Sequence, residues 1–310
     1  MTTGVVAALV FVEGLGAPLD LRTFTPYVLP GDRSACFWLA RHPGGAAIDL
    51  PFEGWSDTRY GIYYQYRTLI HGHSTVNGIG RFRPPLLGML SDPDSPVSNP
   101  SRVGETKALL RALGVRYVVL HRKWFADDAL GEALRAAFAD LVGPAAAEFG
   151  ESTIVDLGEN PPLVREPSRE VPRAFLTVSA MRGDTAAMLD GNVGTRWLSQ
   201  RPQDGTEWIE VGLALTTPVT GVRLRLTGRS LNDYPRALEV AVSRGDARFD
   251  TVATSSVLPE LGAGLRATPA APVIELRWPA RPTRVLRLRQ TGHSARWYWS
   301  VHEIDVLSAP

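Results

Sequence analysis

The first half of the chain alternates between two hydrophobic patterns. Short apolar runs rich in branched residues predict strands at residues 5–12, 46–50, 115–121 and 152–157. Apolar or aromatic positions spaced three and four apart predict helices at residues 60–69 and 101–113, and a third marked by Leu130, Leu134, Phe138 and Leu141. Gly114 suits the position after a helix, where a positive φ is favoured. Alternating strands and helices predict an α/β domain with a partly parallel sheet.

The second half changes to a period of two. Apolar and polar positions alternate at residues 208–213, 222–226, 238–242, 273–276, 285–289 and 302–307. Short alternating strands separated by turns predict an all-β sandwich in which each sheet has one solvated face.

A proline-rich stretch separates the two patterns. Pro161, Pro162, Pro167 and Pro172 remove backbone donors that a helix or a sheet would use. We therefore predict an α/β domain at residues 1–158, a linker at 159–171 and a β-sandwich at 172–310.

Composition narrows the function classes. The 33 basic and 32 acidic residues leave a net charge of +1, which offers nothing to attract a phosphate backbone, so we expect no nucleic-acid partner. Cys36 is the only cysteine, so no intrachain disulfide forms, and we expect a buried, inert thiol. The apolar run at 5–12 is shorter than the roughly 20 residues of a membrane span. It is read either as a strand of a soluble domain or as the trailing end of a membrane helix.

The first half holds no complete catalytic motif. His71-Gly72-His73 could begin a metal site with His121 as a third ligand and Asp57 or Glu53 as a fourth. A polar surface pair or a hydrogen-bonded pair is the simpler interpretation. Gly78-Ile79-Gly80 is not a dinucleotide fingerprint, because Arg83-Pro84-Pro85 follows where the phosphate-binding helix should run.

Several segments of the second half belong together. These are Asp190-Gly191-Asn192, Thr195-Arg196-Trp197, Trp208-Ile209-Glu210-Val211, Trp297-Tyr298-Trp299-Ser300 and Glu303-Ile304. Together they resemble the factor V/VIII type C (discoidin) domain, a family that includes carbohydrate-binding module family 32, over residues 172–310. The resemblance implies a jelly-roll, discoidin-like sandwich and a binding module.

The same resemblance implies a structural Ca²⁺ ion. The matching ligand positions are Asp190, Thr195 and Glu303, and a loop of this kind can add the carbonyl oxygens that calcium prefers. The alternative is a metal-free loop in which Arg196 or a hydrogen-bond network replaces the ion.

The resemblance also implies a glycan site in a loop at one end of the sandwich. Arg229, Asn232 and Asp233 lie in the loop after residues 222–226, and a guanidinium with an amide suits vicinal hydroxyls. Trp297 is the aromatic candidate for the site. The structural alternatives are that Asn232 and Asp233 cap a turn and that the tryptophans fill the core.

A second resemblance concerns residues 63–67, 71–73, 76–78 and 113–119, with Leu50-Pro51. They look like the extracytoplasmic tail of bacterial multi-spanning (GT-C type) glycosyltransferases that use a lipid-linked sugar donor. This implies catalytic residues in a membrane-embedded portion of the same protein. We predict a non-catalytic, extracytoplasmic carbohydrate-binding protein, periplasmic or at the cell surface. The alternative is the soluble portion of such a transferase.

Overall fold

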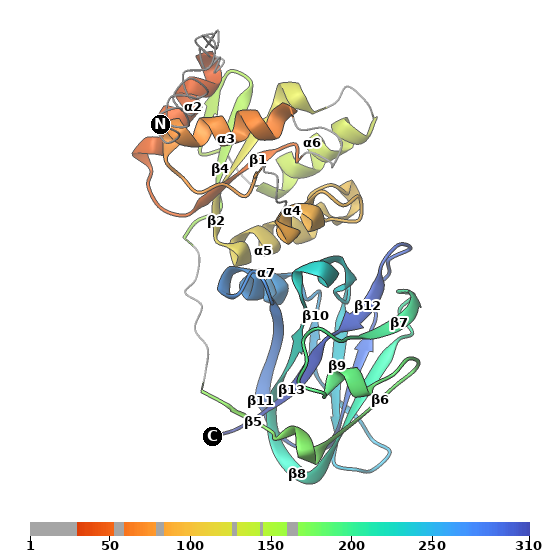
Figure 1. Cartoon of the computed structure of the whole chain (residues 1–310). Coiled ribbons are helices and arrows are strands. Elements are labelled where there is room, and N and C mark those ends of the chain that lie inside the picture. Colours follow the sequence, from red (N-terminus) through yellow and green to blue (C-terminus); the bar gives the residue numbers. More distant parts are fainter. Residues whose placement is uncertain (1–29, 53–58, 79–83, 126–128, 143–144, 160–166) are drawn as a thin grey trace, which may run out of the picture.

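The computed structural model describes residues 30–52, 59–78, 84–125, 129–142, 145–159 and 167–310. The predicted strand at 5–12 lies outside these residues. In Figure 1 an upper unit of helices around a sheet stands on a lower unit made mostly of strands.

The upper unit is an α/β domain, as predicted. Its helices are α2 (Pro30–Arg41), α3 (Arg59–His71), α4 (Pro85–Leu90), η1 (Pro100–Arg102), α5 (Val103–Leu113), η2 (Arg122–Trp124) and α6 (Ala129–Val142). Its strands are β1 (Ala46–Leu50), β2 (Val115–His121), β3 (Ala147–Phe149) and β4 (Ser152–Asp156), in the order β1-β2-β4-β3. β1 pairs with β2 in parallel, and the other pairs are antiparallel. Gly114 ends α5 with φ of 89°, as its position predicted.

The parallel strands β1 and β2 bring two polar residues together at one edge of the sheet. Asp49 lies near the carboxyl end of β1 and His121 at that of β2, the edge at which α/β sheets usually present polar groups.

Cys36 lies fully buried in α2, and burial raises the pKa of its thiol. The prediction of a buried cysteine is therefore confirmed.

The lower unit is the predicted β-sandwich. Its strands are β5 (Arg169–Glu170), β6 (Leu176–Ala180), β7 (Trp197–Pro202), β8 (Trp208–Arg225), β9 (Leu238–Ser243), β10 (Asp250–Ser255), β11 (Val273–Gln290), β12 (Tyr298–Val301) and β13 (Glu303–Ser308). Its helical segments are η3 (Arg173–Phe175), η4 (Ala186–Met188), η5 (Gly228–Asp233) and α7 (Leu258–Ala267). The larger sheet has the order β10-β9-β11-β8-β13-β5, and β6 also pairs with β8. Strands β12 and β7 pair with each other in a second, two-stranded sheet.

Alternation along the strands produces one dry and one solvated face. Ile209, Val211 and Leu213 of β8 are buried, while Glu210 between them pairs with Arg287 at 2.6 Å on the outer face. Trp197 and Trp299 meet edge to face in the core, with ring centroids 5.2 Å apart. For these two tryptophans the core interpretation is correct.

The two units share one continuous hydrophobic core. Helix α5 packs on α7, and both helices lie between the sheets of the two units (Figure 1). A Cβ at Gly262 of α7 would lie 2.8 Å from the Cβ of Ala112, so glycine is what lets these helices approach so closely. A hydrogen bond of 2.9 Å from Ser294 Oγ to Asp94 Oδ2 also crosses this boundary.

Candidate functional site

A pocket of about 510 Å³ lies where the rim of the sandwich faces α4. Its lining comes from four places: Pro84, Pro85 and Gly88 at α4, Arg196 and Leu198 at β7, all of η5, and residues 296–298 before and at β12. The four residues predicted to contact ligand all line it: Arg229, Asn232, Asp233 and Trp297. The structure therefore brings together, in one hollow, residues that are up to 68 positions apart in the chain (297 − 229).

Segment η5 is a short turn with built-in supports. The Thr227 side chain accepts from the backbone of Ser230, and the Ser230 hydroxyl faces back to the Thr227 backbone, which makes a capping box. His302, at the bend between β12 and β13, places Nε2 2.7 Å from Ser230 Oγ and Nδ1 2.8 Å from Val193 O. These contacts fix η5 against the loop that precedes β7.

The polar side chains of η5 differ in their freedom. Asp233 is buried and pairs with Arg196, with Nη1 2.7 Å from Oδ2. Burial raises the pKa of Asp233, and the Arg196 guanidinium opposes that shift. The side chains of Arg229 and Asn232 form no hydrogen bond or ion pair with another residue in the described part of the chain. Both groups are open to a ligand.

Gln203 holds the two walls of the sandwich rim together, and it was not among the residues predicted from sequence. Its Nε2 donates to Tyr234 O at 3.0 Å and to Tyr298 O at 2.9 Å, and its Oε1 accepts from Arg236 N at 3.0 Å. One buried amide thus holds the chain after η5 and the chain beside Trp297. Because every one of these contacts is far away in sequence, no local motif could indicate them.

The α/β unit supplies the opposite wall. Pro84 and Pro85 begin α4 and face η5, where a Cβ at Gly228 would lie 2.6 Å from Pro85 Cγ. Trp297 is half-buried and Tyr298 is 37% exposed, so two aromatic rings border the pocket from the sandwich side. The hollow therefore has proline on one side and aromatic and polar groups on the other.

The three predicted calcium positions also converge. Asp190 Oδ2 accepts from Thr195 Oγ1 at 2.7 Å, and its Oδ1 accepts from Asn192 N at 2.8 Å. These hydrogen bonds lower the pKa of Asp190, while burial raises the pKa of Glu303, which lies beside Asp190.

An arginine of η3 lies beside these positions. Arg173 Nη1 is 2.9 Å from Glu303 Oε2, and its Nη2 is 3.2 Å from Asp305 Oδ1. Arg196, the cation considered from sequence, turns instead to Asp233.

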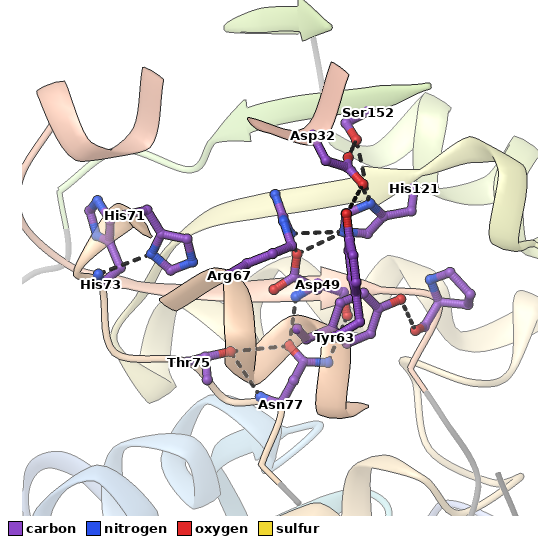
Figure 2. A network of polar contacts seen from close by, with 12 residues as sticks. Asp32, Asp49, Tyr63, Arg67, His71, His73, Thr75, Asn77, His121 and Ser152 are labelled. Atoms are coloured by element: carbon purple, nitrogen blue, oxygen red, sulfur yellow. Dashed lines mark hydrogen bonds and ion pairs between the residues drawn. The ribbon is translucent and has the colours of Figure 1, made fainter. Parts of the chain in front are cut away.

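A separate polar network is buried in the α/β unit (Figure 2). Arg67 of α3 donates to Asp49, and His121 Nε2 lies 2.8 Å from Asp49 Oδ1 and 2.9 Å from Arg67 Nη1. Asp32 accepts from Ser152 and from Tyr63 OH, the latter at 2.6 Å. Burial alone would raise the pKa of Asp32, but contacts with His121, Ser152 and Tyr63 outweigh it and hold that pKa well below its usual range.

This network is buried, and it leaves Asp49 Oδ2, Arg67 Nε and Arg67 Nη2 without a hydrogen-bond partner among the described residues. Burial, followed by the Arg67 charge, lowers the pKa of His121 to about 4. Asn77 completes the lower edge by donating to Asp49 O at 2.8 Å and accepting from Asp49 N at 2.6 Å. We interpret the network as a structural anchor that joins α2, α3 and the sheet.

The histidine pair does not form the metal site considered from sequence. His73 places its ring nitrogens 3.0 Å from Gly45 O and 2.9 Å from Leu39 O, so neither is open to a metal. His121 stands apart from the pair in Figure 2. No group of three histidine, cysteine or acidic side chains that could hold a metal occurs among the described residues. Asp57 and Glu53 lie outside these residues. His73 N donates a hydrogen bond to His71 Nδ1, and both side chains are buried, so the two histidines are a hydrogen-bonded pair and not a polar surface pair.

One protein family matches the sequence of the lower unit. The model of the F5/8 type C domain matches residues 176–304. A search of curated proteins finds no match.

Among solved structures, similarity is found to family 32 carbohydrate-binding modules. One is that of Clostridium perfringens NanJ in complex with galactose, at 13% identity over 46% of this chain and 100% of that one, with a TM-score of 0.36. Another, from C. perfringens GH89 in complex with GalNAc-β-1,3-galactose, has 13% identity over 44% and 99%, with a TM-score of 0.36. A chitosan-binding module from a Paenibacillus chitosanase/glucanase has 21% identity over 44% and 98%, with a TM-score of 0.34.

The sequence match and the observed strand order agree on the same segment. The alternating strands, the core Trp197–Trp299 pair and the loop of residues 190–195 all lie within it. Residues 176–304 of this chain are an F5/8 type C domain of the discoidin type.

Proposed function

We propose that this chain is a non-catalytic carbohydrate-binding protein that holds a glycan in the pocket between the sandwich rim and α4. The observation that supports this most directly is the composition of the pocket. Arg229 and Asn232 present free donors and an acceptor, which suit vicinal hydroxyls, beside the rings of Trp297 and Tyr298, which suit the apolar face of a sugar.

The supports around the pocket favour binding by a preformed site. Gln203 and His302 hold both polar walls through buried contacts, so little of the protein must be ordered when a ligand enters. Such preorganisation lowers the entropic cost of association.

The chemistry of the pocket favours binding over hydrolysis. Glycoside hydrolysis generally uses two carboxyl groups on opposite sides of the scissile bond. Among the described residues that line the pocket, Asp233 is the single carboxylate, and it is already paired with Arg196.

A glycan array probed with the full chain tests this function. Arg229→Ala and Asn232→Ala should each weaken binding roughly five- to tenfold, the effect of one lost hydrogen bond to a polar ligand. Arg289→Ala, which removes an arginine on the outer face paired with Glu239, should leave affinity unchanged. Binding that is identical in all three variants would place the glycan elsewhere, and no binding to any saccharide would overturn the proposed function.

We also propose an extracytoplasmic location, and as second candidate that this chain is the soluble portion of a lipid-linked-sugar glycosyltransferase. The ground for the second candidate is the resemblance of residues 63–67, 71–73, 76–78 and 113–119 to the tails of such transferases. No helix among the described residues is long and apolar enough to cross a membrane. Cell fractionation with protease shaving of intact cells tests the location. Immunoblotting of the membrane fraction tests the second candidate, which expects this sequence within a longer, membrane-embedded polypeptide.

A further inference from the structure

The lining of the pocket has more arginines than carboxylates among its described residues. Arg196, Arg229 and Arg296 all line it, and Asp233 is the single acidic side chain among the described lining residues. Asp233 pairs with Arg196 at 2.7 Å, so that arginine is neutralised.

The other two arginines have no acidic partner. Arg229 and Arg296 are exposed, and neither forms an ion pair or a side-chain hydrogen bond with another described residue. They stand on different walls, one in η5 and one just before Trp297. In contrast, outer-face arginines such as Arg223, Arg225 and Arg287 are each paired with a carboxylate.

Two free guanidinium groups in one hollow select for an anion. A guanidinium donates two parallel hydrogen bonds to a carboxylate, sulfate or phosphate, and such charge-assisted contacts are stronger than contacts with neutral hydroxyls. Resting on the proposed function, we infer that the ligand of this pocket is an acidic saccharide, with its anionic group between Arg229 and Arg296 and a ring face against Trp297 or Tyr298.

The test compares oligosaccharides of equal length by calorimetry with the full chain: oligogalacturonate, sulfated galactose oligosaccharides and neutral galactose oligosaccharides. An acidic ligand should bind at least tenfold more tightly than the neutral one, and affinity should fall as salt rises. The uronate and sulfate arms distinguish the two sources of charge.

Charge-removing variants localise the effect. Arg229→Gln and Arg296→Gln should each lower the acidic-to-neutral preference about tenfold. Arg289→Gln, at an exposed arginine paired with Glu239 outside the pocket, should not change it. Equal or tighter binding of the neutral oligosaccharide overturns the acidic inference while the proposed function stands. Binding to no saccharide overturns both. Tighter binding to phosphatidylglycerol vesicles than to any saccharide would identify a lipid headgroup and also overturn both.

A second inference concerns the loop of residues 190–195. Both oxygens of Asp190 accept hydrogen bonds, and the Glu303 and Asp305 carboxylates are paired with Arg173 at 2.9 and 3.2 Å. Gly191 lies next to this guanidinium: a Cβ at this position would be 3.1 Å from Arg173 Nη1, which is a tight contact. Neither Glu303 oxygen accepts a hydrogen bond from a described residue, so the Arg173 charge is what compensates this buried carboxylate. A Ca²⁺ ion needs six to eight oxygen ligands and would stand against that guanidinium, so these residues do not fit an added ion. The geometry points to Arg173 as the cation that organises this loop in place of calcium.

Thermal melting with excess CaCl₂ and with EDTA decides this second inference. The wild-type midpoint should be the same in both, and titration calorimetry with CaCl₂ should show no binding. Arg173→Gln should lower the midpoint in both buffers, while Arg289→Gln should not. A wild-type midpoint that rises with CaCl₂ and falls with EDTA would overturn the inference, as would an Arg173→Gln midpoint equal to that of wild type.

Discussion

The buried Arg67–Asp49 pair allows a quantitative test of how the α/β unit is held together. Both side chains are 0% exposed, and Arg67 is the full positive charge that faces the Asp49 carboxylate. Arg67→Met keeps much of the side-chain volume but leaves Asp49 buried without its cation. Removing one partner of a buried pair destabilises a protein by about 3–5 kcal/mol. That is a large share of a typical unfolding free energy of about 5–15 kcal/mol.

The assay is urea denaturation of the full chain followed by tryptophan fluorescence and circular dichroism. With an m-value of about 2 kcal/mol/M, the expected loss lowers the urea midpoint of the α/β unit by about 1.5–2.5 M. The double variant Arg67→Met with Asp49→Asn removes both charges. It should recover a large part of the loss, because the penalty comes from the uncompensated carboxylate.

Arg135→Met is the matched control within the same unit. Arg135 is 47% exposed and pairs with Glu132 on the surface of α6, so its loss should cost about 1 kcal/mol or less. An Arg67→Met midpoint no lower than that of Arg135→Met would refute the reasoning, and so would a double variant less stable than Arg67→Met alone.

Three further predictions follow from buried contacts. The pKa values of His71 and His121 are both lowered to about 4, chiefly by burial, so the unfolded chain binds more protons below pH 6.5. The thermal midpoint should therefore fall as pH drops from about 6.5 to about 4, and an unchanged midpoint would contradict these shifts. Gln203→Ala should weaken glycan binding severalfold in calorimetry although Gln203 does not line the pocket; unchanged affinity would remove its positioning role. Gly262→Val should destabilise the contact with α5 by about 1–3 kcal/mol in urea denaturation, since its Cβ meets Ala112; a neutral effect would show that the helices can separate freely.

Local patterns predicted the elements whose hydrophobic period is uninterrupted. The strand at residues 115–121 has the predicted bounds, and the helix at 101–113 begins two residues later, as α5 after η1. Helix α7 was not predicted, although Leu258, Leu261 and Leu265 have helical spacing. Gly262 and Gly264 in its interior weaken its helical propensity, and the packing of α7 on α5 compensates for that.

The long strands show the opposite effect. Residues 208–213 and 222–226 were predicted as two strands but form the single strand β8, and the same holds for β11. Pro218 and Pro282 lie between the predicted segments. In the structure they face each other across the β8–β11 ladder, next to irregularities in register that accommodate them.

The candidate pocket could be predicted only in part. Arg229, Asn232, Asp233 and Trp297 could be selected by residue type and resemblance, and they do line one hollow. Whether they bind a glycan stays a prediction. The α4 wall could not be foreseen, because Pro84 and Pro85 reach the pocket only through docking of the two units, which depends on contacts distant in sequence.

Because the pocket lies between the α/β unit and the sandwich, ligand binding is coupled to the association of these two units. A compound that touches both η5 and the start of α4 has full affinity only while the two units stay together, so by reciprocity its binding must hold them together. Saturation with such a compound would protect amide hydrogens of α5 and α7 from exchange, although those helices lie outside the contact surface.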